Sequence, residues 1–273
     1  MAAAVFGAVL VAIVSASPAA AQACVAASQV VDSDGDFRRM ARSLEGLCLT
    51  EETFSEGGLT WRLQWVASGR RGPLWVALHD NEHAAFDAGV AALRRHGGTL
   101  VAVETGGNRN NGGRDPNRNF SARGVGCSNL GTNGSPAYVE RFMSQLGNHT
   151  GVISLHTNAT GSSATGGSGT ISIKAPFPNS QALPGAAKPG MPRDEDTLAI
   201  VPSRGGVPAL ATNLQRAGVN VLVENLGGPG GGDCSMSNFM GALGIGYVSL
   251  EARHGDAGSL GKLIDAVMRS RWH

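Results

Sequence analysis

The sequence of 273 residues contains little charge and lacks the signatures of several common protein classes. Only 16% of its residues are charged and the formal net charge is +1, so no basic block indicates a nucleic acid or an anionic membrane as partner. No G-x-S-x-G motif is present, which argues against a serine hydrolase. The glycine run at 227–232 lacks the Lys-Ser or Lys-Thr of a phosphate-binding loop, which argues against a nucleotide enzyme.

Long apolar runs are also absent, and after residue 23 no segment is suited to a transmembrane helix. Residues 1–23 have the pattern of a signal peptide, with a short apolar core and small residues ending in Ala21-Gln22-Ala23. Cys24 directly after this cleavage pattern would also suit a lipoprotein, but Ala21 stands where that signal usually has Leu. We therefore expect an exported protein, periplasmic or secreted; a lipoprotein is the less favoured alternative.

Cysteine is scarce, and the four cysteines all lie after the expected cleavage site. An even number in an oxidising compartment predicts two disulfides, for which three pairings exist. We favour Cys24–Cys48, which would tie down the N-terminal segment, and Cys127–Cys234, which would join two loops. Free buried thiols are the alternative.

Strand and helix patterns alternate along the rest of the chain, which predicts one α/β/α sandwich with a mixed, largely parallel sheet. We divide the exported chain into an N-terminal segment, 24–58, and a catalytic domain, 59–273. We expect a hairpin-like turn at 69–72 between the first two strands and a further hairpin near 169–176. Strands are expected at 59–68, 73–79, 98–104, 151–158, 196–203, 219–225 and 246–252, and helices at 36–49, 82–98, 135–147, 207–217 and 258–272.

An acidic run at 32–36, Asp-Ser-Asp-Gly-Asp, superficially resembles a calcium loop. Its glycine is at the fourth position instead of the sixth, and Ser43 stands where the closing Glu belongs. We interpret the run as a helix start with capping carboxylates.

His79 and Glu82 lie where a buried-type strand gives way to a helix, and His156 ends another such strand. Side chains three residues apart can face one point, and imidazole and carboxylate groups are zinc ligands. Alone, the His79–Glu82 pair fits equally well a helix-capping Glu beside a half-buried His. With His156 it predicts an open His₂Glu site for one zinc ion.

Zinc hydrolysis also needs a carboxylate that is not a ligand. Glu251, near the end of the strand at 246–252, is our candidate, with Glu224 as its rival; either one could instead cap a helix or pair with an arginine. His254 lies three residues further on, and we expect it at most to contact the ligands without binding the metal itself.

An arginine- and asparagine-rich loop supplies candidates for substrate binding, although such a loop can be merely solvated surface. Arg118 with Asn117 can bind a carboxylate in planar geometry. Arg109 and Arg114 are candidates for polarising a scissile carbonyl.

The order of these motifs resembles that of the zinc carboxypeptidase superfamily, which includes the succinylglutamate desuccinylase and aspartoacylase branch. The matching parts are His79-x-x-Glu82, Asp115-Pro-Asn117-Arg118-Asn-Phe, the strand ending at His156 and the strand ending at Glu251. The resemblance implies zinc ligation by His79, Glu82 and His156, carboxylate binding by Asn117 and Arg118, and Glu251 as general base. Asp80 departs from the Gly that the deacylases commonly have after the first histidine.

Three functions follow from these observations. The first is an exported zinc peptidase of the carboxypeptidase type, acting on small peptides such as those of the cell wall. The second is an N-acyl amino acid deacylase, and the third is a non-catalytic binding module on the same fold. The peptidase is favoured because acyl amino acid catabolism is mostly intracellular.

Overall fold

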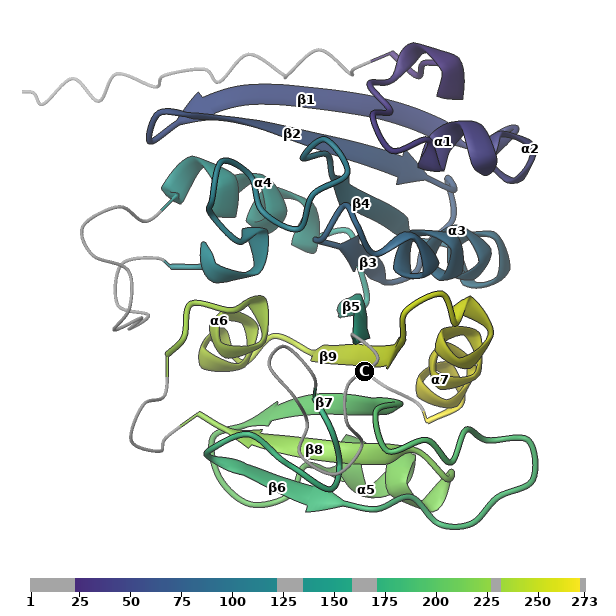
Figure 1. The fold of residues 1–273 in the computed structure, drawn as a ribbon, viewed down its shortest axis with the longest axis vertical. Coiled ribbons are helices and arrows are strands. Elements are labelled where there is room, and N and C mark those ends of the chain that lie inside the picture. The colour runs from purple at the N-terminus through teal and green to yellow at the C-terminus, as the bar shows by residue number, and fades with distance from the viewer. Residues whose placement is uncertain (1–22, 122–134, 159–170, 227–231, 271–273) are drawn as a thin grey trace, which may run out of the picture.

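The computed structural model describes residues 23–121, 135–158, 171–226 and 232–270. Nine strands form one sheet in the order β1-β2-β4-β3-β5-β9-β7-β8-β6 (Figure 1). The four central strands, β4, β3, β5 and β9, run parallel, and antiparallel strands flank them. The predicted α/β fold with one mixed sheet is confirmed. The strands are β1 (Cys48–Glu56), β2 (Leu59–Ala67), β3 (Leu74–Ala77), β4 (Thr99–Val103), β5 (Val152–Asn158), β6 (Ser180–Leu183), β7 (Leu198–Ser203), β8 (Asn220–Asn225) and β9 (Tyr247–Arg253).

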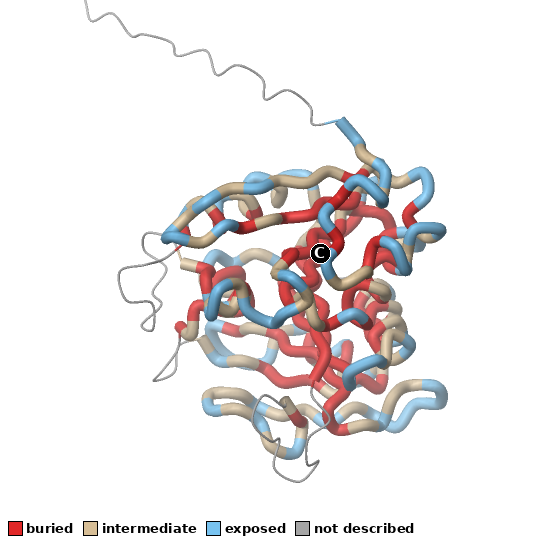
Figure 2. The backbone as a smooth tube through the Cα atoms, turned by 45° about the horizontal axis from the view of Figure 1, so that its top comes forward, coloured by how far each residue is buried: buried red, intermediate tan, exposed pale blue. Residues whose placement is uncertain are grey.

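Helices cover both faces of this sheet (Figure 1). α3, α5 and α7 pack on one face in one hydrophobic cluster, together with the short N-terminal helices. α4 and α6 pack on the other face in a second, aromatic-rich cluster. Figure 2 shows the buried residues concentrated between these layers. The α-helices are α1 (Asp36–Arg39), α2 (Ala41–Leu44), α3 (His83–His96), α4 (Pro136–Leu146), α5 (Ala209–Arg216), α6 (Met236–Leu243) and α7 (Ala257–Arg269), with 3₁₀ turns η1 (Ala27–Gln29) and η2 (Pro116–Arg118).

The central strands β3 and β5 are buried along their whole length, as continuous apolar strands between two helical layers should be. α3 connects β3 to β4 and ends at Gly97, whose N–H bonds the Leu93 carbonyl. The next residue, Gly98, has φ +92°, and a Cβ there would lie 2.0 Å from the Pro73 carbonyl oxygen. Only glycine allows the chain to return into β4 at this point.

The N-terminal segment differs from our prediction. The helix expected at 36–49 is two short helices, and the chain then enters β1, which we did not predict. β1 and β2 form a hairpin across Gly57 and Gly58, both with positive φ, as two-residue hairpin turns require. Because β1 belongs to the sheet, the segment 24–58 is structurally continuous with the rest of the molecule. The Cys24–Cys48 disulfide is present as predicted.

The hairpin predicted across 69–72 is wrong. β2 pairs with β4, and β3 lies on the far side of β4, so the segment between them crosses over a strand that comes later in the sequence. The strand β6 was also missed, and residues 171–176 of the hairpin expected near 169–176 form no strand.

Three predictions concern residues outside the described part of the chain. They are the signal peptide up to residue 22, the Cys127 half of the second disulfide and the start of the hairpin at 169–176. Among the described residues, no helix combines the length and apolar character needed to cross a bilayer.

Candidate metal centre

The three side chains predicted to hold a metal meet at the carboxyl edge of the parallel strands. His79 lies just beyond β3, Glu82 precedes the first turn of α3, and His156 is in β5. β3 and β5 are adjacent and parallel, which places the two histidines side by side. All three residues are buried, and one donor atom from each lies within 4.8 Å of the others.

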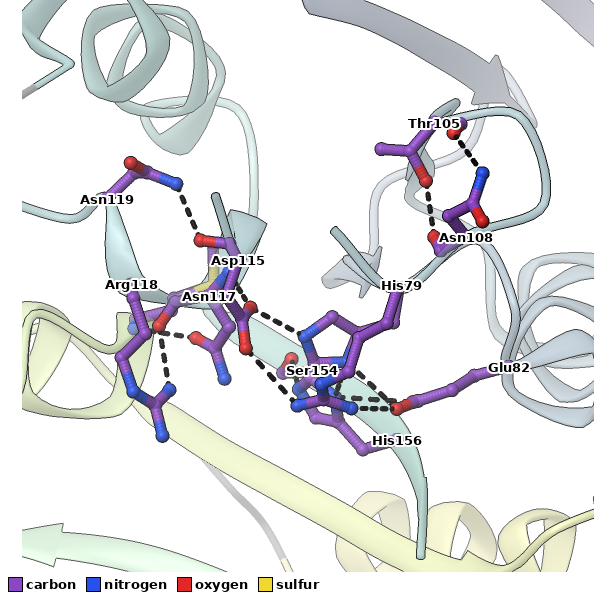
Figure 3. Close-up of polar contacts among 12 residues, drawn as sticks. His79, Glu82, Thr105, Asn108, Asp115, Asn117, Arg118, Asn119, Ser154 and His156 are labelled. Atoms are coloured by element: carbon purple, nitrogen blue, oxygen red, sulfur yellow. Dashed lines mark hydrogen bonds and ion pairs between the residues drawn. The ribbon is translucent and has the colours of Figure 1, made fainter. Parts of the chain in front are cut away.

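Both imidazoles turn their Nδ1 atoms toward the Glu82 carboxylate (Figure 3). His79 Nδ1 lies 2.9 Å from Glu82 Oε1, and His156 Nδ1 lies 3.4 Å from Glu82 Oε2. The two Nδ1 atoms are only 3.2 Å apart. Two ring nitrogens and a carboxylate directed at one point form a group that can bind a metal ion.

A second set of contacts holds these candidate ligands on the side away from their meeting point. Asp115 Oδ1 lies 2.9 Å from His79 Nε2, and Ser154 Oγ lies 2.7 Å from His156 Nε2. The Thr157 N–H donates to Glu82 Oε2 over 2.8 Å. A carboxylate on Nε2 favours the tautomer with Nε2 protonated, which leaves Nδ1 of His79 free for a metal.

Sequence reasoning placed Asp115 in a motif but gave it no role. The signal was present, since Asp115 precedes the Pro-Asn-Arg turn and caps η2 by accepting the Asn117 N–H. Which distant side chain its carboxylate would meet depends on the fold.

The electrostatics of the cluster favour an anionic Glu82. Burial alone would raise the pKa of Glu82, but its contacts with His156 and His79 hold that pKa well below the usual carboxylate range. Burial likewise disfavours a charged imidazole at His79, yet Asp115 and Glu82 raise its pKa. Burial lowers the pKa of His156. The site therefore holds one firmly ionised carboxylate beside an imidazole whose positive charge is stabilised, and a cation would meet the same field.

Glu251 lies beside this cluster. It is on β9, directly opposite His156 of β5 in the parallel register, and it is buried. Burial raises the pKa of Glu251 to about 8, and the negative charge of Glu82 contributes to this increase. A carboxyl group that titrates near neutrality beside a potential metal site can exchange protons with a substrate.

Glu224, the rival candidate, lies elsewhere. It is on β8, which β7 separates from β9. Its carboxylate accepts hydrogen bonds from Ser237 and Asn238 in the first turns of α6. Glu224 therefore anchors a helix, the structural alternative that we considered for it.

Asn117 and Arg118 lie on one side of Asp115, and the candidate metal ligands His79, Glu82 and His156 lie on the other (Figure 3). Asn117 Oδ1 accepts the Met236 N–H at the start of α6 over 2.9 Å. The Arg118 guanidinium is half exposed and lies 3.3 Å from the Asp233 carboxylate, so it remains accessible to an anion from solvent.

The structure separates the two remaining arginines. Arg109 Nη1 donates to Glu82 Oε1 over 2.9 Å, and its Nη2 lies 3.3 Å from Asp115 Oδ2. Arg114 instead contacts Ser135 Oγ and lies against Gly57 in the β1–β2 turn. Of these two arginines, it is Arg109 that the fold brings to the candidate centre. His254 contacts a neighbour of His156 and none of the three candidate ligands: its Nδ1 lies 2.7 Å from Thr157 Oγ1.

No family model matches the sequence, and no curated protein matches it. Several solved structures are similar to this chain in fold. Bovine thrombin-activatable fibrinolysis inhibitor, solved with a tick carboxypeptidase inhibitor, is 12% identical over 89% of this chain and 99% of its own, with a TM-score of 0.46. Murein-tripeptide amidase from Escherichia coli O157 is 14% identical over 85% and 96%, with a TM-score of 0.43. An aspartoacylase family protein from Mesorhizobium loti is 11% identical over 83% and 68%, with a TM-score of 0.41.

The likeness to these structures concerns the fold alone. The functional assignment rests on the geometry of the site.

Proposed function

We propose that the protein is an exported zinc-dependent hydrolase that cleaves an amide bond next to a free carboxylate. One observation carries the proposal: His79, Glu82 and His156 converge at one point, and Glu251 lies in register beside His156. Ligands and an additional carboxylate at the same strand edge are what metal-assisted hydrolysis requires.

The donor set fits zinc. Two imidazoles and one carboxylate form the usual open catalytic zinc site, and Asp115 behind His79 provides the carboxylate–histidine support typical of such sites. A zinc ion held there supplies the Lewis acid that activates water and polarises an amide.

The protein's own side chains would perform the remaining tasks. Glu251 takes a proton from the attacking water and passes it to the leaving amine, a role suited to a pKa near the working pH. Arg118 binds the substrate carboxylate. Arg109, which already lies against Glu82 and Asp115, stabilises negative charge on the carbonyl oxygen.

The Cys24–Cys48 disulfide supports export, because disulfides persist mainly in oxidising compartments. In such a compartment small peptides, including cell-wall peptides, are the expected substrates. N-acyl amino acids are the second candidate class, since they too present an amide beside a carboxylate.

The test combines metal analysis with activity screening. We expect about one zinc per chain and chelator-sensitive hydrolysis of C-terminal peptide substrates. Turnover of N-acyl amino acids alone would move the assignment to a deacylase. Bound zinc without turnover on either panel would indicate a binding module, and a zinc-free, inactive protein with intact ligands would refute the proposal.

A further inference from the structure

A second group of potential metal ligands lies beside the turn that carries His79. Asp34 comes from the acidic run before α1, Asp80 directly follows His79, and Glu104 directly follows β4. One carboxylate oxygen of each lies within 4.8 Å of the others. The three residues are far apart in the sequence, so only the fold brings them together.

Backbone amides hold these carboxylates in place. Asp80 Oδ2 accepts the N–H groups of Thr105 and Gly107, both over 2.7 Å. Glu104 accepts those of Gly106 over 2.8 Å and Ser33 over 3.2 Å. The three loops are therefore joined through their acidic side chains.

Asp34 carries the most direct sign of a missing partner. Its side chain is only 5% exposed; Oδ1 accepts the Asp36 N–H over 3.1 Å, whereas Oδ2 is buried without a hydrogen bond. The half-exposed His83 has its Nδ1 3.3 Å from this Oδ2 and 2.9 Å from Asp36 Oδ1. An oxygen buried in this way costs free energy unless something binds it.

The negative charge of the group is largely uncompensated. Within the described parts of the chain, no Lys or Arg forms an ion pair with Asp34, Asp80 or Glu104. Burial raises the pKa of Asp34 to about 6, and the charges of Asp36 and Glu104 add to this increase. Such crowding of carboxylates is unfavourable in the absence of a cation.

There is also space for a single small occupant. A cavity of about 10 Å³ lies beside two of the three carboxylates, Asp34 and Asp80, and its lining also includes Gln64 and apolar side chains such as Phe37 and Phe86. This volume is about that of one water-sized sphere, which leaves no room for an organic ligand beside these two carboxylates.

We propose that Asp34, Asp80 and Glu104 bind a calcium ion next to the His79 turn. Carboxylate oxygens are the ligands of hard cations, and three of them directly on one ion suit calcium better than magnesium, which keeps more of its water. The proposal gives Asp80 a function: it ligates the second cation where the similar deacylases commonly have glycine. Calcium would join the disulfide-linked N-terminal segment to the His79 turn and to the loop after β4.

The experiment uses the full exported chain with zinc present, in calcium or in a calcium-selective chelator. Equilibrium dialysis with metal analysis should find about one calcium per chain, and saturating calcium should raise Tm by about 5 °C. Asp34→Asn and Glu104→Gln should each weaken calcium binding at least about tenfold, whereas Glu45→Gln, at an exposed glutamate, should not.

The chelated state separates a calcium site from a structural role. In chelator, the Tm of each variant should equal or exceed that of the unaltered protein, because one of the crowded charges is gone, whereas the Tm increase with calcium should be smaller. The proposal is overturned if the unaltered protein binds no calcium at millimolar concentration, if both variants bind like it, or if magnesium produces an equal shift. Zinc content is measured in parallel, so a failure here leaves the proposed hydrolase untouched.

Discussion

Glu251 and Glu224 are both acidic residues near the ends of buried strands in one sheet, but they have different surroundings. Glu224 accepts hydrogen bonds from Ser237 and Asn238, so helix α6 satisfies its carboxylate. Glu251 lies opposite His156, next to the charge of Glu82, and burial raises its pKa to about 8. Both positions carry the same local pattern, and the neighbouring elements decide which glutamate remains available for chemistry.

The strongest test of this contrast is to neutralise each glutamate in turn. Glu251→Gln should lower kcat by about 10³-fold, because no base remains to accept the proton of water. Glu224→Gln should stay within a few-fold of the unaltered enzyme. Activity is measured on the best substrate found in the panels, with zinc content as control. If kcat fell as much in the Glu224 variant as in the Glu251 variant, Glu251 could not be singled out as the base.

The next largest effect concerns Asp115, which contacts the candidate ligand His79 from the side opposite the metal position. Asp115→Ala should weaken zinc affinity about 10–100-fold, because His79 loses the acceptor on Nε2. Competition with a chromogenic chelator measures this, and Asp265→Ala on α7 is the surface control. Equal affinities in the two variants would show that Asp115 does not support the metal.

The pH dependence of stability should distinguish the two glutamates more finely. The pKa of Glu251 is raised in the folded state from 4.5 to about 8, so its contribution to stability is present below pH 4.5 and is lost as pH rises through about 8. Between pH 6 and 9, zinc-free protein should lose about 3 kcal/mol of unfolding free energy through this group.

Urea unfolding at the two pH values measures this loss. Glu251→Gln should remove most of it. Glu224→Gln should remove less, because hydrogen bonds from Ser237 and Asn238 oppose the increase that burial causes in the pKa of Glu224. A pH profile that Glu251→Gln leaves unaltered would contradict the raised pKa.

The smallest predicted effect concerns the substrate carboxylate. Arg118→Lys should raise KM about tenfold with little change in kcat, because lysine cannot make a bidentate contact. Arg114→Lys, at a residue that the fold directs toward Ser135, is the matched control. A larger KM change in the Arg114 variant would show that carboxylate binding had been assigned to the wrong arginine.

The sequence was most informative where one segment determines its own environment. Continuous apolar runs predicted β3 and β5, and the polar residues at their ends predicted the side chains that converge at the candidate metal centre. β1 was missed because its Glu51 and Glu52 and its partly exposed side chains lack the apolar run of a central strand. The Gly57-Gly58 turn was an available hairpin signal.

Pairing between distant segments could not be predicted in this way. The turn at 69–72 was misjudged because β4, the true neighbour of β2, occurs later in the chain. The acidic run at 32–36 was interpreted as a helix start, and Asp32 accepts the N–H groups of Phe37 and Arg38 there. The proposed cation site instead combines Asp34 with residues 46 and 70 positions further along the chain, which no local pattern indicates.

The disulfide at the N-terminus has a consequence for solubility. β1 is an outer strand of the sheet, and such strands can recruit a strand from another molecule. Val25 pairs with Leu49 of β1, and the Cys24–Cys48 bond holds it there, so the beginning of this rim is covered. The opposite rim, β6, is only four residues long. Reduction of the disulfide would release Val25 from Leu49 and expose the start of β1 to strand addition by another molecule. We therefore expect aggregation to be the first effect of a reducing environment.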